Sequence, residues 1–470
     1  MNVPHLETST NAMPKGLLKG WIIISIATLL SLGLYQVLPY DEHANKGLSL
    51  LLFIAILWLT EAIHITITAL LVPVLAVLIG MPSDSNGKLV PISTSKALST
   101  FADPIIFLFF GGFALATALH IQKLDRKIAM WIISMSRGHL GISVLTIFIV
   151  TAILSMWISN TATAAMMLPL ALGLLSHLDI AKERRTFVFI LLGIAYSASI
   201  GGLGTLVGSP PNAIAAKALG YDFTDWMKIG LPMMLLILPA MLVSLYLALR
   251  PKLNHKVEFK TEHIPWTKMR IATMLLFIAT AMAWIFSKSI SERFGISQPD
   301  TWVALSAACL VVILGTATWK DISDNTDWGV LMLFGGGLTL SAVLKDSGTS
   351  LVLGQTLANA FGYTSPLLII IIVTAFIIFL TEFTSNTASA ALLVPVFAAI
   401  ADQMGMPKEI LVIVIGIGAS CAFMLPVATP PNAIVFGTGF VQQSEMMRVG
   451  IILNVLCVAL ISSFVYLFFL

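Results

Sequence analysis

Two polar tripeptides lie inside apolar sequence, one in each half of the chain, and their residue types suit the binding of an anion. Residues 159–171 read SNTATAAMMLPLA and residues 385–397 read SNTASAALLVPVF, with seven of thirteen positions identical. Asn and Thr side chains offer amide and hydroxyl donors, and the free backbone N–H groups of a helix N-terminus add to them. Because an alanine-rich segment follows each tripeptide, we expect a helix to begin there. A simple polar contact between membrane helices would not explain the duplication.

A second duplicated motif, Pro-Pro-Asn-Ala-Ile, follows each tripeptide at Pro210–Ile214 and Pro430–Ile434. A proline removes its own donor and clashes with the carbonyl four residues back, so each motif predicts a broken helix. Carbonyls around Leu206–Gly208 and Val427–Ala428 would then be released. Freed carbonyls at membrane depth are tolerated where they line a cavity, and there they are ligands for a small cation. Two simple proline kinks would not explain why Asn-Ala-Ile recurs as well.

A glycine cluster precedes each tripeptide, at Phe110-Gly111-Gly112 and at Phe334-Gly335-Gly336. The same three motifs therefore recur in the same order, which predicts one binding site assembled from two structural repeats, as in many secondary transporters. We interpret the triple glycine that ends at Gly337 as a site of close helix packing. A phosphate loop is disfavoured because no strand precedes the glycines and no P-loop lysine follows.

The composition places the chain among membrane proteins. Of its 470 residues, 58% are hydrophobic and only 10% are charged, and the mean hydropathy is +0.95, whereas soluble domains carry about 25% charged residues. The net charge of +3 does not indicate a nucleic-acid partner, because the basic residues lie in short loops. We interpret Cys309, Cys421 and Cys457, which lie in apolar stretches, as packing residues.

The expected fold is an all-α polytopic membrane protein with about 11 transmembrane helices and two re-entrant hairpins. Two apolar stretches, 140–178 and 364–401, are about 38 residues long and carry Ser-Asn-Thr near the middle. Two short helices meeting at such a polar tip would enter and leave on the same side. Runs long enough to cross the bilayer lie at 21–38, 47–63, 65–80, 104–119, 186–216, 226–249, 271–287, 300–316, 327–343, 408–438 and 447–470.

The distribution of Lys and Arg predicts the orientation. With the N-terminus inside, most of the 26 basic residues fall on the cytoplasmic side, including the strongly basic loop Arg250–Arg270 between the repeats. The C-terminus would then end outside. Each repeat has five crossings after an extra first helix, so the second copy is inverted relative to the first. One hairpin would enter from the cytoplasm and the other from outside, and the two tips could meet near the midplane.

Few ionisable residues lie inside the apolar stretches. Glu61 and Glu382 are functional candidates by default. Glu382 lies three residues before Ser385 and could carry a proton. We favour a carboxylate that pairs with backbone or polar groups and locks the hairpin. His64 and His120 lie near span ends, where an interfacial place is expected.

These residues resemble the divalent anion/sodium symporter family, and most closely its bacterial INDY-type dicarboxylate transporters. Paired Ser-Asn-Thr motifs, each followed by Pro-Pro-Asn-Ala-Ile, are similar to that family's signature, and the resemblance extends from about Trp21 through essentially the whole chain. It implies a homodimer in the bacterial cytoplasmic membrane, with sodium as coupling ion and no organic cofactor. Each protomer would have a scaffold domain and a transport domain that moves like an elevator.

The resemblance also implies a division of the chain. An amphipathic helix at 120–138, with Lys123, Arg126 and Lys127 off its apolar face, would link two rigid parts. The expected parts are a cytoplasmic tail (1–20), scaffold helices (21–119), this interfacial helix (120–138), the first part of the transport domain (139–249), a cytoplasmic loop with scaffold helices (250–343), a second interfacial helix (344–361) and the second part of the transport domain (362–470).

Carried over to this sequence, the family's site residues fall on the duplicated motifs. Each tripeptide would hold one carboxylate of the substrate. Thr384 departs from relatives, in which this position is small, but changes little if its ligand is the backbone carbonyl. The substrate residues would be Ser159, Asn160, Thr161, Ser385, Asn386 and Thr387, with Thr429 and Pro430 beside them. One sodium would lie near Ser155, Ser159, Asn160 and the Gly208 carbonyl, and the other near Thr381, Thr384, Asn386 and the Ala428 carbonyl.

The sequence thus predicts a sodium-coupled importer of C4-dicarboxylates such as succinate, malate and fumarate. Neither motif contains Lys or Arg, so a bound dianion would need compensating charge that cations can supply. A dicarboxylate exchanger, a citrate or sulfate transporter of the same fold, and proton coupling through Glu382 are the alternatives. An enzyme is disfavoured because HExxH, GxSxG and CxxC patterns are absent from the sequence. An anion channel fits two half-hairpins less well than alternating access does.

Overall fold

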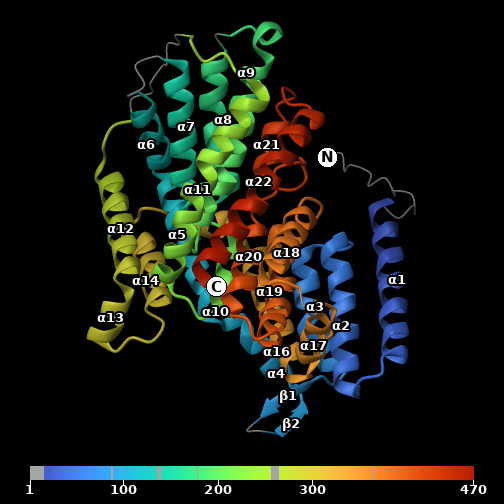
Figure 1. Cartoon of the computed structure of the whole chain (residues 1–470). Helices are drawn as coiled ribbons and strands as arrows, with labels where there is room; N and C mark the ends of the chain where they lie inside the picture. The colour runs from blue at the N-terminus through green and yellow to red at the C-terminus, as the bar shows by residue number, and fades with distance from the viewer. Residues whose placement is uncertain (1–14, 86–87, 135–138, 177, 256–263, 362–363) are drawn as a thin grey trace, which may run out of the picture.

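A computed structural model of the chain describes residues 15–85, 88–134, 139–176, 178–255, 264–361 and 364–470. This part is mostly helical, which confirms the expected class of an all-α membrane protein (Figure 1). Most of the tail 1–20 and the segment 256–263 of the basic loop lie outside the described residues.

One group of helices, which we call the outer bundle, comes from the first part of each half of the chain. Helix α5 packs on α14, α3 on α16, and α1 on α2. A short antiparallel hairpin of β1 (Pro82–Ser85) and β2 (Lys88–Pro91), which the sequence reasoning did not anticipate, follows α3. The helices are α1 (Lys15–Val37), α2 (Glu42–Thr60), α3 (Ile65–Leu78), α4 (Thr94–Leu98), α5 (Pro104–Ile121), α12 (Lys268–Ile285), α13 (Ser287–Phe294), α14 (Pro299–Ile313), α15 (Trp319–Asn325) and α16 (Trp328–Asp346).

A second group, the site bundle, contains both duplicated motifs and lies between α12–α14 on one side and α1–α3 on the other (Figure 1). Helix α9 packs on α7, α8 and α11, and α19 packs on α10 and α20. The helices are α7 (Leu140–Ser155), α8 (Asn160–Leu175), α9 (Ile180–Gly201), α10 (Pro210–Leu219), α11 (Phe223–Leu249), α18 (Pro366–Leu380), α19 (Asn386–Gln403), α20 (Lys408–Gly418), α21 (Pro430–Phe436) and α22 (Gln443–Phe469).

Two further helices, α6 (Leu124–Ser134) and α17 (Thr349–Phe361), connect the bundles. Each starts later than the sequence analysis expected, because α5 continues to Ile121 and α16 to Asp346. A residue with positive φ, Lys123 at 54° in one case and Gly348 at 75° in the other, turns the chain before the connecting helix begins. Helix α6 packs on both α5 and α7, and α17 on both α16 and α19, so each connecting helix touches both bundles.

Eight helices in the described part of the chain are long and apolar enough to cross a membrane, and the pair α13 and α14 is bent by 97°. The expected crossing at 65–80 is a helix of only 14 residues. The crossing expected at 408–438 is broken between α20 and α21. Length alone therefore does not reach the predicted count of 11, which stays a prediction.

The glycine clusters bring helices of the outer bundle close together, as expected for the triple glycine that ends at Gly337. A Cβ at Gly111 on α5 would lie 2.4 Å from the carbonyl oxygen of Ala304 on α14, and one at Gly336 on α16 would lie 2.5 Å from that of Ala69 on α3. Neither contact is possible for a larger residue without backbone movement. Each cluster therefore allows one pair of helices to pack closely, in the first and in the second half of the chain.

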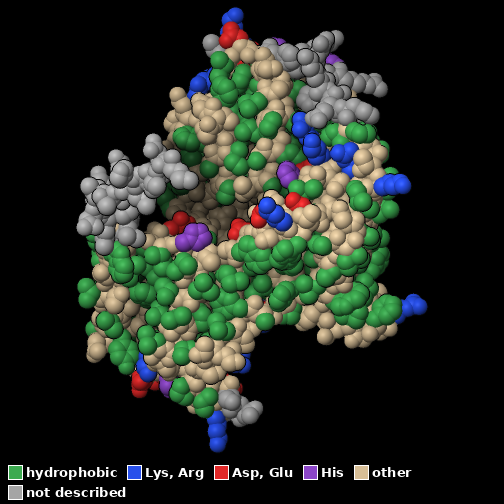
Figure 2. All heavy atoms as spheres, turned by 180° about the vertical axis from the view of Figure 1, so that it is seen from behind, with side chains coloured by type: hydrophobic (Ala, Val, Ile, Leu, Met, Phe, Trp, Pro, Cys, Tyr) green, Lys and Arg blue, Asp and Glu red, His purple; other side chains and the backbone are tan. Residues whose placement is uncertain are grey.

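The surface has the character of a membrane protein. Large hydrophobic side chains point outward along the helices, including Leu29, Leu78, Ile313 and Leu467, each more than 70% exposed. Figure 2 shows these green side chains across much of the lower half of the molecule, with charged and His side chains at the two ends and around a hollow at mid height. A surface of this kind is expected where lipid replaces water.

Candidate functional site

Both Ser-Asn-Thr segments lie at a break between two helices, α7 and α8 in the first half and α18 and α19 in the second, and each begins the second helix, as expected. We call each helix pair a hairpin, and their re-entrant path through the membrane stays a prediction. Ser159 caps α8 by accepting a hydrogen bond from the Ala162 N–H (3.2 Å). Ser385 caps α19 through the Ala388 N–H (3.4 Å). Each serine hydroxyl therefore already caps its own helix. The next residue, Asn160 or Asn386, is the first of the tripeptide whose side chain is not used for capping.

The Pro-Pro motifs begin helices rather than kink them. Helix α10 starts at Pro210 and α21 at Pro430, and the chain before each is irregular from Thr205 to Ser209 and from Ala419 to Thr429. Proline is tolerated at the first helical positions because no intrahelical N–H is needed there. The carbonyls without a helical partner therefore include those at the end of the preceding helix, α9 or α20. These lie further back than the carbonyl four residues before the proline. Thr429 caps α21 through the Asn432 N–H (3.3 Å).

The first half-site gathers oxygen atoms around Asn160. The Ser155 hydroxyl lies 2.6 Å from Asn160 Oδ1 and 2.7 Å from the Ala198 carbonyl oxygen. The same end of the Asn160 amide lies 3.1 Å from the Ala198 carbonyl oxygen and 3.3 Å from the Gly208 carbonyl oxygen. With Oδ1 at this end, the amide faces only other acceptors. With the amide turned by 180°, Nδ2 lies there and donates to both carbonyls. Converging side-chain and carbonyl oxygens at the end of a broken helix are how transporters coordinate a small cation.

Glycine forms the wall of this half-site. A Cβ at Gly202 would lie 2.5 Å from Asn160 Oδ1, and one at Gly208 would lie 2.6 Å from the Gly202 carbonyl oxygen. The loop can therefore approach the Asn160 amide only because both positions lack a side chain.

The second half-site repeats the arrangement around Asn386. The Thr381 hydroxyl contacts Asn386 Oδ1 and lies 3.0 Å from the Ala419 carbonyl oxygen. The Thr384 hydroxyl is engaged elsewhere, with Ser389 Oγ at 2.7 Å, which leaves its backbone carbonyl as the expected ligand.

The structure thus brings together four of the predicted residues, Ser155 with Asn160 and Thr381 with Asn386, and places the Gly208 carbonyl beside the first pair. Sequence reasoning missed Ala198 and Ala419, because an alanine whose contribution is its backbone carbonyl leaves no signal in residue type. Ala428 corresponds to Gly208 by its place two residues before Pro-Pro. Thr161 and Pro430 are exposed and Thr387 is half-buried, and their contact with substrate stays a prediction.

Glu382 joins the second hairpin to the second broken helix. Its side chain is only 1% exposed, and its carboxylate accepts hydrogen bonds from the N–H groups of Phe423 (2.7 Å), Met424 (2.9 Å) and Leu425 (3.0 Å). The side-chain amide of Asn454 on α22 donates to it as well (2.7 Å). Both oxygens accept, which suits an ionised carboxylate and fits the interpretation of Glu382 as a lock. Glu61, by contrast, is exposed at the end of α2.

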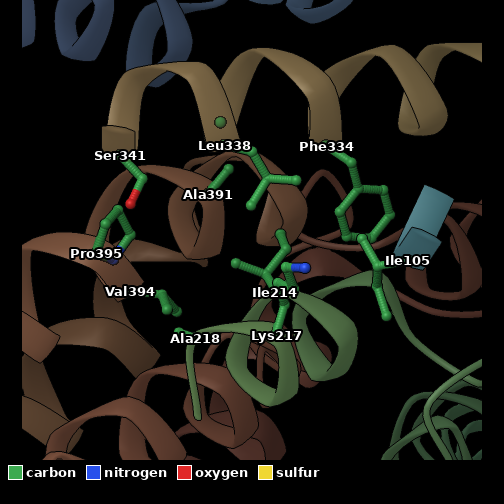
Figure 3. A pocket seen from close by; sticks show the side chains of 11 residues that line it. Ile105, Ile214, Lys217, Ala218, Phe334, Leu338, Ser341, Ala391, Val394 and Pro395 are labelled. Carbon is green, nitrogen blue, oxygen red and sulfur yellow. The ribbon is translucent and has the colours of Figure 1, made fainter. Parts of the chain in front are cut away.

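A cavity of about 220 Å³ lies between the two bundles, away from both tripeptides. Figure 3 shows α16 on one side of it and α10 and α19 on the other, with mostly apolar side chains between. Lys217 of α10 lines it, and its Nζ lies 2.8 Å from the Asp103 carboxylate at the start of α5. Because close-packed interiors leave few voids larger than a water molecule, the bundles fit together incompletely here.

Comparisons with known proteins cover nearly the whole chain. The family described as the sodium:sulfate symporter transmembrane region matches residues 22–469. An uncharacterized transporter of Haemophilus influenzae is 57% identical over 460 residues, 96% of this chain and 98% of that protein. The sodium-dependent dicarboxylate transporter SdcS of Staphylococcus saprophyticus is 32% identical over 96% of this chain and 91% of its own length.

A solved structure shares the fold. The crystal structure of the YdaH transporter of Alcanivorax borkumensis superposes with a TM-score of 0.57 over 86% of this chain and 98% of that one, at 12% sequence identity. Fold likeness and family match thus agree with the resemblance carried by the duplicated motifs. The chain belongs to the sodium:sulfate symporter family, the divalent anion/sodium symporters, and is a multi-pass membrane transporter.

Proposed function

We propose that this protein imports C4-dicarboxylates such as succinate, malate and fumarate, coupled to the entry of sodium. The observation that carries the proposal is the pair of matching half-sites, in which Asn160 and Asn386 each meet a hydroxyl five residues earlier and that hydroxyl meets a carbonyl of the broken helix. The amide of each Asn has an oxygen for a cation and an N–H₂ for an anion. One residue can therefore bind both.

Charge supports sodium coupling. The half-sites are built from hydroxyls, amides and carbonyls, so they have no fixed positive charge to balance a dianion. Two bound sodium ions would supply it, and removing either ion would weaken the binding of the anion. The name of the SdcS relative, a sodium-dependent dicarboxylate transporter, supports the same substrate class.

A movement of the site bundle as one body would carry the substrate. Both half-sites lie in this bundle, and the amphipathic helices α6 and α17 join it to the outer bundle. The cavity beside Lys217 indicates a boundary at which the bundles can slide. We propose that the outer bundle is the scaffold of a homodimer in the cytoplasmic membrane, with the N-terminus inside and the C-terminus outside.

Uptake of labelled succinate into proteoliposomes tests this function. We expect accumulation with an inward sodium gradient and none with potassium in its place, together with competition by malate and fumarate. Equal uptake without a sodium gradient, driven by internal dicarboxylate, would identify an exchanger instead. Stronger competition by citrate or sulfate than by malate would reassign the substrate.

A further inference from the structure

The asparagine that follows each Pro-Pro pair is buried and makes hydrogen bonds that its position in the motif does not predict. Asn212 and Asn432 are both fully buried and lie in the first turn of α10 and α21. Asn212 Nδ2 donates to the carbonyl oxygens of Gly202 (2.8 Å) and Thr205 (2.7 Å). Each side chain thus reaches back across the break to the chain before it.

The two repeats match in detail. Asn432 Nδ2 donates to the carbonyl oxygens of Ala422 (3.2 Å) and Leu425 (3.0 Å), which lie ten and seven residues earlier, as Gly202 and Thr205 do relative to Asn212. Such a match between the two halves of the chain indicates a shared structural requirement. The amide replaces helix N–H groups that the break has removed.

The orientation of both amides is determined by these contacts. Neither Asn212 Oδ1 nor Asn432 Oδ1 has a hydrogen-bond partner within the described part of the chain, whereas each Nδ2 faces carbonyl oxygens. Turning either amide would place its oxygen against other oxygens. The N–H₂ group is therefore the part of each side chain that makes the hydrogen bonds.

These contacts separate the carbonyls of the first broken helix into two sets. Those of Gly202 and Thr205 are held by Asn212, while those of Ala198 and Gly208 remain directed toward Asn160. Gly202 also stands against the Asn160 amide, where a Cβ would lie 2.5 Å away. Asn212 therefore acts on the cation half-site through the Gly202 backbone.

We propose that Asn212 and Asn432 are positioning residues for the two cation sites, each holding its broken-helix loop without touching cation or anion. The inference rests on the proposed sodium coupling and adds to it the residues that set sodium affinity. It predicts that losing either amide weakens sodium binding and leaves the dicarboxylate site competent once sodium is saturating.

Sodium titration of succinate uptake tests this with Ala and Ser variants of Asn212 and Asn432. Asn45 provides a matched control, because it is also buried and its Nδ2 binds two carbonyls, of Leu38 (3.0 Å) and Tyr40 (3.2 Å), in the turn between α1 and α2. Asn212→Ala and Asn432→Ala should each raise the half-saturating sodium concentration about tenfold or more, as expected for the loss of hydrogen bonds, with the succinate KM at saturating sodium near wild type.

The Ser variants keep one short donor and should show a smaller shift, and Asn45→Ala should show none. An unchanged sodium dependence in the Ala variants would overturn the inference while leaving sodium coupling intact. Failure of both Ala and Ser variants to assemble, with Asn45→Ala assembling normally, would also overturn it by assigning the amides to the fold. A wild-type protein whose uptake ignores sodium would overturn this inference together with the proposed function.

Discussion

Ser209 Oγ and Ser420 Oγ lie 3.1 Å apart, although 211 residues separate them in the sequence. Ser209 precedes the first Pro-Pro pair and Ser420 lies in the loop after α20, so this contact joins the two broken helices. The loops that precede the two Pro-Pro motifs therefore meet, and one site assembled from both duplicated motifs stays a prediction. Both half-sites can act on a single ligand only if the loops that carry them meet in this way.

Asn160→Ala and Asn386→Ala are each expected to abolish succinate uptake while the protein still assembles. In the proposed function each substitution would remove an anion donor and a cation ligand together, and a charge-assisted hydrogen bond is worth about 1.5–3 kcal/mol. The measurement is succinate uptake in proteoliposomes, with assembly followed by size-exclusion chromatography. Transport at near-normal affinity and rate in either variant would show that the site lies elsewhere.

Gly202→Ala is expected to raise the sodium requirement strongly, because the new Cβ would lie 2.5 Å from Asn160 Oδ1 and would displace the amide. The matched control is Gly173→Ala in α8, where a Cβ meets nothing within 4 Å. We expect the control to keep normal uptake and to be more stable by about 0.5–1 kcal/mol, since Ala is favoured over Gly in a helix. Equal sodium dependence in the two variants would contradict the half-site.

Glu382→Gln is expected to destabilise the protein, because the new amide N–H₂ would face backbone donors that now bind the carboxylate. Each donor left unsatisfied costs about 1–3 kcal/mol of folding free energy. The measurement is the unfolding temperature in detergent, which should fall. Met156 holds the corresponding place after Ser155 in the first repeat, so Met156→Leu is the matched control and should cost less than about 1.5 kcal/mol.

Glu382 also distinguishes sodium from proton coupling. We expect no uptake driven by a pH gradient in sodium-free buffer, because the carboxylate is occupied by donors and serves as an anchor. Wild-type uptake that follows the pH gradient without sodium, and that disappears in Glu382→Gln protein that is still folded at the assay temperature, would instead establish proton coupling.

Contacts between the bundles test the proposed motion. Lys217 and Asp103 are paired across the bundle boundary, and the rings of Trp157 and Trp284 lie 6.4 Å apart between the first hairpin and α12. Paired cysteines at either pair of positions, in a background lacking the three native cysteines, should be joined by a bifunctional methanethiosulfonate crosslinker that spans the lost side chains, and this should stop uptake until a reductant is added. Full transport by the crosslinked protein would exclude sliding at this boundary.

Much of the fold followed from the sequence because apolar length and duplicated motifs are strong signals. Both hairpins and both broken helices lie where the paired motifs predicted them. Boundaries were less accurate where a single residue decides the turn, as at Lys123, whose positive φ no composition rule anticipates. The hairpin of β1 and β2 was not predicted, because strands of only four residues each are too short to give a clear alternation of apolar and polar residues.

The site was predictable to the extent that side chains build it. Asn160 and Asn386 were identified because polar residues are rare in apolar sequence. The carbonyls of Ala198 and Ala419 were not, since any residue has a carbonyl and only the fold decides which ones converge. Asn212 and Asn432 had a signal, the recurrence of Asn after Pro-Pro, but only the structure shows the hydrogen bonds that they donate to the preceding loop.

We propose that cation and dicarboxylate share one site, and the affinity of the purified protein for succinate at increasing sodium concentration measures the coupling between them. Linkage requires that if sodium strengthens succinate binding, succinate strengthens sodium binding by the same factor. We predict that succinate affinity, measured by calorimetry, rises with sodium concentration and that potassium at equal ionic strength leaves this affinity unchanged. Succinate affinity that is the same in sodium and in potassium would contradict the shared site.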